Sequence, residues 1–330
     1  MSTPELVSNQ LIILMPVYND WDALGRLLPA LAHELSANSL RAAILLVDDG
    51  SSVPPPKNLA DENYSSIESI DILHLRRNSG HQRAIAVGLC YIQANRPCHQ
   101  VVIMDCDGED DPRDVPRLVR ECLAHEEQKI IFAMRIRRSE NLAFRFFYHS
   151  YRLIHFLLTG IPVRVGNFSV VPISSMRHLA AVSELWIHYA AAVHKAKLPM
   201  ATIPTQRSPR LAGPSRMDPV ALVIHGLSAM AIFGDRIGVR LLILVSCEIV
   251  LATAGLAIAV GARLFTGTLV IPDWAFYDVV VLFVMLIQML LLLLVFAFVI
   301  LALRDRSMVI PSRDYVDITD GLQRVYGQTS

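Results

Sequence analysis

The sequence predicts an α/β domain with a mostly parallel sheet, followed by two membrane-spanning helices. Strand-like and helix-like segments alternate through the first ~135 residues, which is typical of a sheet covered by helices on both faces. Two long apolar runs follow near the C-terminus, at 241–262 and 279–303. The composition agrees, because 53% of the 330 residues are hydrophobic and the mean hydropathy is +0.42, too apolar for an ordinary soluble domain.

Four short apolar segments are expected to form strands: Leu11–Met15, Ala43–Val47, Ile70–Leu75 and Val101–Met104. Helices are expected from about Trp21 to Leu35, where Asp20 can act as the N-cap, and from Gln82 to Ala94. Ligands of such sheets collect beyond the carboxyl ends of the strands. Polar residues follow three of these ends, at 16–20, 48–51 and 105–107.

Six carboxylates lie between Asp105 and Asp114, and they divide into two groups. Asp111, followed by Pro112 and then by Asp114, fits the start of a helix, so these two acids are interpreted as structural. Asp105 and Asp107 are expected to project to the same side of an extended segment. Mg²⁺ or Mn²⁺ takes oxygen ligands and needs only one or two carboxylates when substrate phosphates supply others. Asp105 and Asp107 therefore predict a metal site, to which Glu109 can add an oxygen.

The sequence contains no P-loop, G-x-G-x-x-G or H-E-x-x-H motif, so a phosphate must be bound by other means. Five arginines fall within eighteen residues that contain a single acid, Glu140; they are Arg135, Arg137, Arg138, Arg145 and Arg152. Planar guanidinium groups suit bidentate phosphate contacts. This segment is therefore a candidate phosphate-binding region.

The two apolar runs, of about 22 and 25 residues, are each long enough to cross a ~30 Å hydrocarbon core as a helix. Arginines before the first run and after the second place both termini in the cytosol by the positive-inside rule. A buried helical hairpin of a large soluble protein is the alternative. Glu248 is expected to face the partner helix, another subunit or polar lipid, because an ionised group in hydrocarbon is costly.

Two further helices are expected to lie in the membrane surface, at about 142–158 and 218–234. On the first, one face would carry five polar residues: Arg145, Tyr148, His149, Arg152 and His155. Apolar residues including Phe146 and Leu157 would lie broadly opposite, which is the pattern of an interfacial helix. A charged face turned simply to water is the alternative.

The overall charge and the cysteines exclude some classes of protein. The formal net charge is zero, which gives no support to a nucleic-acid partner. The five cysteines have no paired spacing and are odd in number, which argues against a disulfide framework. The N-terminal residues lack a secretory-signal pattern, so most of the chain is expected in the cytosol.

Seven motifs occur in an order that resembles the polyprenyl-phosphate glycosyltransferases of glycosyltransferase family two. They are PVYND (16–20), VDDGS (47–51), RNSGHQRA (77–84), MDCDGEDDP (104–112), an R-x-x-R pair (135 and 138), VGNF (165–168) and RLAGPSRM (210–217). The family includes dolichyl-phosphate mannose synthases and bacterial undecaprenyl-phosphate sugar transferases. The match covers about residues 10 to 240, and the two-span tail is similar to that of the bacterial enzymes.

The resemblance implies a GT-A catalytic domain that binds a nucleotide sugar and a divalent metal, Mg²⁺ or Mn²⁺. The positions that match the family's nucleotide-binding residues are Pro16, Tyr18, Asp20 and Asp49. Asp105 and Asp107 match its D-x-D motif, with Asp107 as the direct metal ligand, and Glu109 stands where glutamine is common. Arg135, Arg138 and Arg145 match basic residues that receive the lipid phosphate.

Three positions depart from the family pattern. Asn167 and Ser169 replace an aspartate and an arginine of the G-D-F-R box, which puts sugar or acceptor contacts there in doubt. Arg216 replaces the lysine of the G-x-S-K segment and preserves its charge.

The implied activity is inverting transfer of a sugar from a UDP- or GDP-sugar to a polyprenyl phosphate, for modification of cell-envelope glycans. The alternatives are an inactive scaffold of the same fold and a processive polysaccharide synthase, although neither a Q-x-x-R-W motif nor further spans are found. The expected division is a nucleotide-sugar part (1–140), an acceptor part (141–240), the two spans and a cytosolic tail (304–330). The expected location is a bacterial inner membrane, and the expected assembly is a homo-oligomer.

Overall fold

The computed structural model describes residues 11–56, 59, 64–135, 142–162, 165–213, 219–266, 273–304 and 309–327. The chain forms two compact units. The first unit consists of Met1–Arg145, Arg164–Ile232 and Val309–Ser330, and the second consists of Phe146–Val163 and Phe233–Met308. The first unit holds every polar strand end that the sequence analysis singled out.

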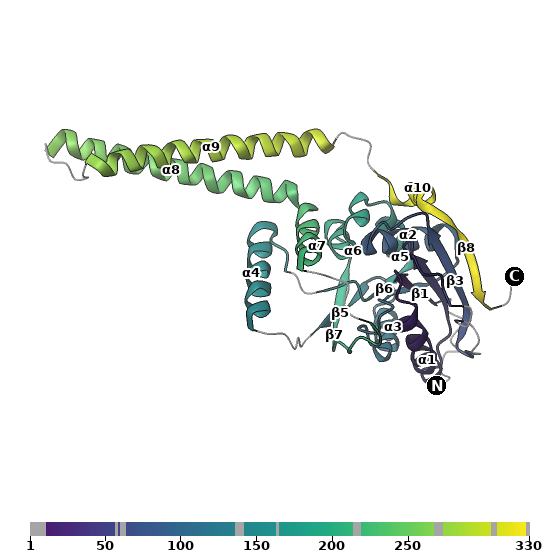
Figure 1. The fold of residues 1–330 in the computed structure, drawn as a ribbon. Coiled ribbons are helices and arrows are strands. Elements are labelled where there is room, and N and C mark those ends of the chain that lie inside the picture. The colour runs from purple at the N-terminus through teal and green to yellow at the C-terminus, as the bar shows by residue number, and fades with distance from the viewer. Residues whose placement is uncertain are drawn as a thin grey trace. The chain divides into compact units, whose positions relative to one another are not determined.

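The first unit is built on one eight-stranded sheet with the order β7-β5-β6-β4-β1-β2-β3-β8 (Figure 1). Its strands are β1 (Leu11–Val17), β2 (Ala42–Asp48), β3 (Ile67–Leu75), β4 (Gln100–Ile103), β5 (Ile130–Arg135), β6 (Ser169–Pro172), β7 (Met200–Thr205) and β8 (Thr319–Tyr326). Strands β1 to β4 are mutually parallel, as the alternation of apolar and helical segments predicts. The whole sheet is mixed, because β6 runs antiparallel to β4 and β5, and β8 runs antiparallel to β3.

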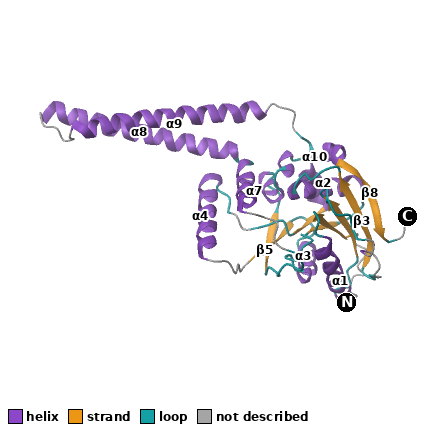
Figure 2. Ribbon diagram, in the orientation of Figure 1, coloured by secondary structure: helices purple, strands orange, loops and turns teal. Residues whose placement is uncertain are grey.

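Helices cover both faces of this sheet, and Figure 2 separates them from the strands by colour. The helices of the first unit are α1 (Trp21–Ala37), α2 (His81–Asn95), α3 (Val115–Ala124), α5 (Ile173–Ala180), α6 (Tyr189–Lys195), α7 (Pro219–Ala231) and α10 (Pro311–Asp314), with 3₁₀ turns η2 (Pro112–Asp114), η3 (Ser183–Trp186) and η4 (Tyr315–Ile318). Leu24 of α1 packs in one core with Ile13, and Leu89 of α2 packs in the other with Leu14. Alternate residues of β1 therefore enter opposite cores, as the two-residue period of a strand requires.

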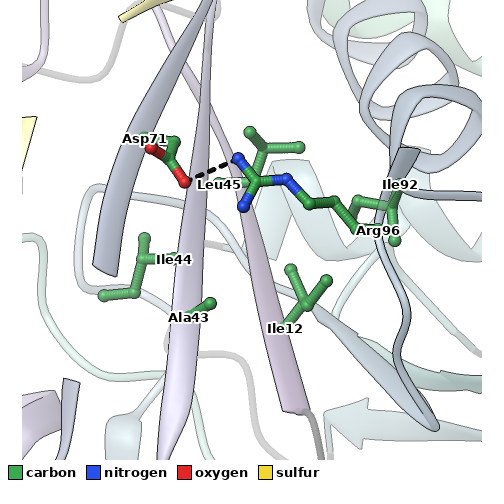
Figure 3. A pocket seen from close by; sticks show the side chains of 7 residues that line it. All are labelled: Ile12, Ala43, Ile44, Leu45, Asp71, Ile92 and Arg96. Atoms are coloured by element: carbon green, nitrogen blue, oxygen red, sulfur yellow. Dashed lines mark hydrogen bonds and ion pairs between the residues drawn. The ribbon is translucent and has the colours of Figure 1, made fainter. Parts of the chain in front are cut away.

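The segment that the sequence analysis assigned to a tail forms α10, η4 and β8, and β8 becomes an edge strand of the sheet. A buried carboxylate holds it there. Asp71 on β3 is 2% exposed and receives Arg324 Nε of β8 and Arg96 Nη2, each at 2.7 Å from a carboxylate oxygen. Figure 3 shows Arg96 reaching Asp71 from the end of α2. Two guanidinium groups thus neutralise one carboxylate and fix the position of the last strand.

The second unit contains α8 (Gly234–Thr266), α9 (Asp273–Arg304) and most of α4 (Leu142–Thr159). Two stretches are long and apolar enough to cross a membrane, Gly234–Ile258 and Val279–Val299. Only 6% of each is buried within the chain, unlike the core helices of a soluble protein. Helix α8 begins earlier than expected, so Arg236 and Arg240 lie in its first turns rather than before it.

Helix α4 forms where the sequence predicts it, but its expected polar face is wrong at His155. The His155 side chain is 3% exposed, and its Nδ1 lies 2.9 Å from the carbonyl oxygen of Ile161. Arg240 Nη1 donates to the Leu157 carbonyl oxygen at 2.8 Å. The end of α4 therefore contacts the start of α8 through Arg240, whereas the imidazole contacts the residues that follow α4.

Candidate active site

Acidic side chains gather at the carboxyl ends of β4, β1 and β2, which are neighbours in the sheet. Asp20 follows β1, Asp48 ends β2 and is followed by Asp49, and Asp105 and Asp107 follow β4. Because parallel strands end at the same edge of a sheet, residues that are distant in sequence meet there. The edge therefore concentrates carboxylates, as the sequence analysis predicted.

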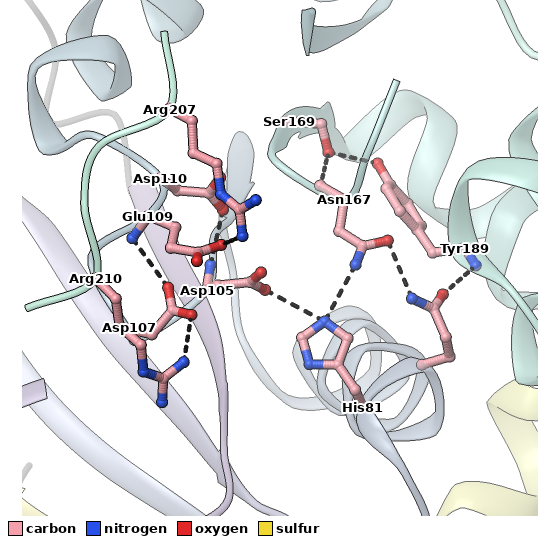
Figure 4. A network of polar contacts seen from close by, with 11 residues as sticks. His81, Asp105, Asp107, Glu109, Asp110, Asn167, Ser169, Tyr189, Arg207 and Arg210 are labelled. Atoms are coloured by element: carbon pink, nitrogen blue, oxygen red, sulfur yellow. Dashed lines mark hydrogen bonds and ion pairs between the residues drawn. The ribbon is translucent and has the colours of Figure 1, made fainter. Parts of the chain in front are cut away.

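The segment after β4 is a turn, so the expectation that Asp105 and Asp107 project together from an extended chain is wrong. Gly108, at φ +83°, allows the chain to reverse there. The Asp105 carboxylate lies 3.2 Å from His81 Nε2, whereas the Asp107 carboxylate points to Arg210 (Figure 4). The two carboxylates thus have different partners, although they are one residue apart.

A loop at 206–213, directly after β7, closes over this turn. The Ser208 N–H donates to the Glu109 carbonyl oxygen at 3.0 Å, and the Leu211 N–H donates to the Asp107 carbonyl oxygen at 2.9 Å. A Cβ atom on Gly108 would lie 2.4 Å from Leu211 Cγ, so the loop packs tightly against a residue without a side chain. Backbone hydrogen bonds and this close contact hold the loop on the acidic turn.

Two arginines of this loop pair with the acids, and the sequence analysis assigned a role to neither. Arg210 Nη1 lies 2.8 Å from Asp107 Oδ2 and its Nη2 lies 2.7 Å from Asp20 Oδ1. Arg207 pairs with Glu109 (Figure 4). One signal was available: six carboxylates in ten residues need counterions, and 207–210 supplies two arginines. Which arginines do so depends on the path of the loop after β7.

The electrostatics of Asp107 bear on whether a cation fits here. The pKa of Asp107 is raised, mainly by burial and also by the neighbouring Asp105 and Glu109 carboxylates. The Glu109 N–H and the Arg210 guanidinium lower this pKa in part. Within the described ranges, no group of three His, Cys, Asp or Glu side chains is arranged to hold a metal. The oxygens of Asp107 and Glu109 suit Mg²⁺ or Mn²⁺ whose other ligands come from a substrate phosphate and water. The residues fit such a shared cation rather than an all-protein cage.

Asp111 and Asp114 have the structural roles that the sequence predicts. Asp111 is the N-cap of η2, where its side chain accepts from the Arg113 N–H at 3.0 Å, and Pro112 takes the first position. Asp114 pairs with Arg117 one turn later.

A second polar network surrounds His81 and includes two of the three departures from the family pattern, Asn167 and Ser169. The Tyr189 N–H donates to Gln82 Oε1 at 2.7 Å, and Gln82 Nε2 donates to Asn167 Oδ1 at 3.1 Å. The Asn167 amide nitrogen lies 3.1 Å from His81 Nε2, and the Ser169 hydroxyl lies 2.8 Å from that of Tyr189. Asn167 and Ser169 therefore connect β6 to α2 and α6, next to Asp105 (Figure 4).

The remaining nucleotide-site candidates have distinct environments. Pro16 lies within β1 opposite Val47, and Tyr18 is 40% exposed beyond the end of the strand. The Asp49 carboxylate accepts from the N–H groups of Ser79, at 2.6 Å, and Gly80, at 2.9 Å. Burial raises the pKa of Asp49, whereas these two N–H groups lower it. Asp49 therefore fixes the loop before α2, and contact with a nucleotide stays a prediction.

For most of the candidate phosphate-binding arginines, the structure does not describe the side chain. Arg135 is the last residue of β5 and Arg145 lies in α4, but only their backbones are described. Arg138 and Arg216 lie outside the described residues. Their role therefore stays a prediction.

Comparison with known proteins identifies the family. Residues 12–179, slightly more than half of the chain, match the model of glycosyl transferase family 2. The chain belongs to glycosyltransferase family 2. Its α/β domain has the GT-A-like fold of this family, and the family resemblance inferred from its motifs is confirmed.

Several curated relatives match a shorter stretch. An uncharacterized glycosyltransferase of Synechocystis is 33% identical over 126 residues, 38% of this chain and 37% of the relative. An undecaprenyl-phosphate 4-deoxy-4-formamido-L-arabinose transferase of Klebsiella pneumoniae is 27% identical over 130 residues, 39% of this chain and 38% of the relative. The chain thus matches little more than a third of the length of these relatives. Among solved structures, the chain is similar to glucosyl-3-phosphoglycerate synthase from Mycobacterium tuberculosis, which was solved in complex with Mn²⁺, UDP-glucose and phosphoglyceric acid. The two are 12% identical with a TM-score of 0.48, and the match covers 70% of this chain and 80% of that one.

Proposed function

We propose that this glycosyltransferase moves a sugar from a UDP- or GDP-sugar to a polyprenyl phosphate at the cytosolic face of a membrane. The main support is the arrangement of Asp20, Asp107 and Glu109 opposite Arg207 and Arg210 at the carboxyl ends of the strands. Such an edge is where ligands of α/β sheets bind. The 27% identity to undecaprenyl-phosphate transferases and the two apolar helices favour a lipid phosphate as acceptor.

On the donor side, Asp107 and Glu109 would hold Mg²⁺ or Mn²⁺, with Asp105 beside them. The cation would neutralise charge on the leaving diphosphate. Arg210 and Arg207 already contact the same carboxylates, so they are placed to donate to phosphate oxygens once a cation takes over their partners. Pro16, Tyr18, Asp20 and Asp49 would lie around the nucleotide.

On the acceptor side, Arg135, Arg138 and Arg145 would hold the lipid phosphate, and Arg216 would add positive charge. A phosphate monoester with a second pKa of ~6 is largely dianionic at neutral pH, so the nucleophile needs no general base. The chain's task is to bring two anions together and align them, which can supply several kcal/mol. A single displacement at the anomeric carbon would invert its configuration.

The proposed location is a bacterial inner membrane, with the first unit in the cytosol. The segments that flank the two apolar helices both belong to the first unit, which supports a hairpin with both ends on the same side of a membrane. Arg236 and Arg240 at the start of α8, and Arg304 at the end of α9, favour the cytosolic side. Exposed apolar side chains on α4 and α7, such as Leu157 and Ile224, suit contact with the membrane surface. A homo-oligomer is proposed for the assembly.

The test uses the purified full chain with a panel of UDP- and GDP-sugars, Mg²⁺ or Mn²⁺, and undecaprenyl phosphate. We expect release of UDP or GDP only when one sugar nucleotide and the lipid are both present, together with a sugar-labelled lipid. An inactive scaffold would release no nucleotide with any donor, and a processive synthase would give a polymer rather than a lipid-linked monosaccharide. Either result would contradict the proposal.

A further inference from the structure

Three polar side chains form a row across neighbouring strands at the ligand-binding edge of the sheet. Asp48 at the end of β2 is the register partner of His74 on β3, and Gln323 lies on β8, the next strand. His74 Nδ1 lies 3.0 Å from Asp48 Oδ2, and His74 Nε2 lies 3.2 Å from Gln323 Oε1. The row thus runs from the last strand of the chain to the end of β2, next to the candidate site.

Asp48 also contacts the turn that follows β2. Its second oxygen, Oδ1, accepts from the Ser51 N–H at 2.9 Å. The Ser51 hydroxyl oxygen in turn accepts from the Asn19 N–H at 2.8 Å, in the loop after β1. The Asp48 carboxylate, which is 7% exposed, therefore connects His74 to the turn that contains Asp49 and, through Ser51, to the loop that contains Asp20. Both acids are candidate nucleotide-binding residues.

The turn at 48–51 has little freedom to take another shape. Gly50 adopts φ +70°, and a Cβ atom there would lie 2.6 Å from the backbone nitrogen of Asn78. Asp49 accepts two N–H groups from the loop at 79–80. A shift of Asp48 would therefore move Asp49 and the loop before α2 together.

The position of β8 does not depend on Gln323. The Asp71 carboxylate holds Arg324 at 2.7 Å, and the Tyr64 N–H donates to the Tyr326 hydroxyl oxygen at 3.0 Å. Gln323 itself is exposed. The Gln323 side chain can therefore be removed while the strand stays in the sheet, so that its effect on the turn can be measured alone.

We propose that Gln323 is a positioning residue for the donor site: through His74 and Asp48, the C-terminal strand sets the turn that carries Asp49. The strand follows the second apolar helix in the chain, so a segment beyond the membrane helices contributes to nucleotide binding. This inference rests on the proposed function for its donor half. A strand that only completes the sheet would affect stability without changing donor affinity.

The experiment compares Gln323→Ala, the conservative Gln323→Glu, which keeps an acceptor for His74, and Asp320→Ala, an exposed control on the same strand. The first readout is amide hydrogen exchange at 49–53 in the ligand-free full chain. The second is the set of apparent KM values for nucleotide sugar and for polyprenyl phosphate. We expect about fivefold faster exchange and an about fivefold higher donor KM in Gln323→Ala, as for loss of one hydrogen bond, with acceptor KM and kcat unchanged. Gln323→Glu and Asp320→Ala should behave like the wild type.

Unchanged exchange in Gln323→Ala would overturn the coupling between the strand and the turn. Faster exchange with an unchanged donor KM would overturn the role in donor binding. If the wild type released no nucleotide while Gln323→Ala still loosened the turn, the proposed function would fail and the coupling would stand.

Discussion

Arg210 lies between two acids from different strand ends, with its guanidinium nitrogens 2.8 Å from Asp107 and 2.7 Å from Asp20. The arginine comes from the loop after β7, 103 residues after Asp107 and 190 after Asp20 in sequence. A guanidinium group therefore stands where the proposed function requires a cation and a diphosphate. If the proposed function holds, donor binding and this ion pair would compete for the Asp107 carboxylate.

Asp107→Asn should abolish sugar transfer and leave the protein folded. The substitution keeps the size of the side chain and removes the charge that a divalent cation needs, so we expect turnover to fall by about a hundredfold or more. Release of UDP or GDP measures it. A variant with near wild-type turnover would remove the metal-site proposal.

Arg210→Ala should make the protein depend on a divalent cation for stability. Without the guanidinium, Asp20 and Asp107 repel each other, and we expect the unfolding midpoint in EDTA to fall by roughly 2–6 °C. Mn²⁺ should raise the midpoint more in the variant than in the wild type, because the cation replaces the missing charge. Arg41→Ala, an exposed arginine 3.6 Å from Glu68, is the matched control. Equal Mn²⁺ shifts in the variant and the wild type would argue against competition at Asp107.

Arg138→Ala should raise the apparent KM for polyprenyl phosphate much more than that for the nucleotide sugar. The reason is that its proposed partner is the acceptor phosphate, whose charge it neutralises. Steady-state kinetics with each substrate varied in turn measure both constants. Equal effects on the two substrates would count against the assignment.

The elements of the fold that follow from local sequence patterns were predictable. Strands β1 to β4 and their helices follow from alternating apolar and helical patterns, and the membrane-length helices follow from uninterrupted apolar runs. The family was predictable because seven motifs occur in order. The acidic strand end was found, since Asp105 and Asp107 directly follow a short apolar strand.

What depends on distant contacts was not predictable. Strand β8 carries glycine and mostly exposed residues, so its sequence lacks a strand pattern, and its pairing depends on Arg324 reaching Asp71, 253 residues away. The turn at 106–107, which directs the two D-x-D carboxylates to different partners, was not predictable, although the glycine that follows it was visible. The positions of Arg207 and Arg210 depend on a loop whose path is fixed only by the folded domain.

Four cysteines should resist alkylation in the folded protein. Burial raises the pKa of Cys90 to about 12, of Cys98 to about 11 and of Cys122 to about 12, and raises that of Cys106 well above the ordinary value. Because a raised pKa lowers the thiolate fraction at a given pH, at most about one in a thousand of the Cys90, Cys98 and Cys122 thiols is ionised at pH 8. Iodoacetamide followed by mass spectrometry should modify them only after denaturation. Rapid labelling of native Cys90 would contradict the packing of α2, and the same assay checks that Asp107→Asn is folded.

Asp71→Ala should destabilise the protein more than any exposed substitution on β3. The carboxylate is 2% exposed and neutralises both Arg96 and Arg324, so its removal leaves two partly buried guanidinium groups without their partner. Breaking a buried ion pair on one side costs about 3–5 kcal/mol, which lowers the unfolding midpoint by roughly 6–15 °C. Glu68→Ala on the same strand removes only an exposed pair and should change the midpoint by about 1–2 °C. Thermal unfolding in detergent compares the two variants, and equal midpoints would mean that Asp71 does not hold β8 in the sheet.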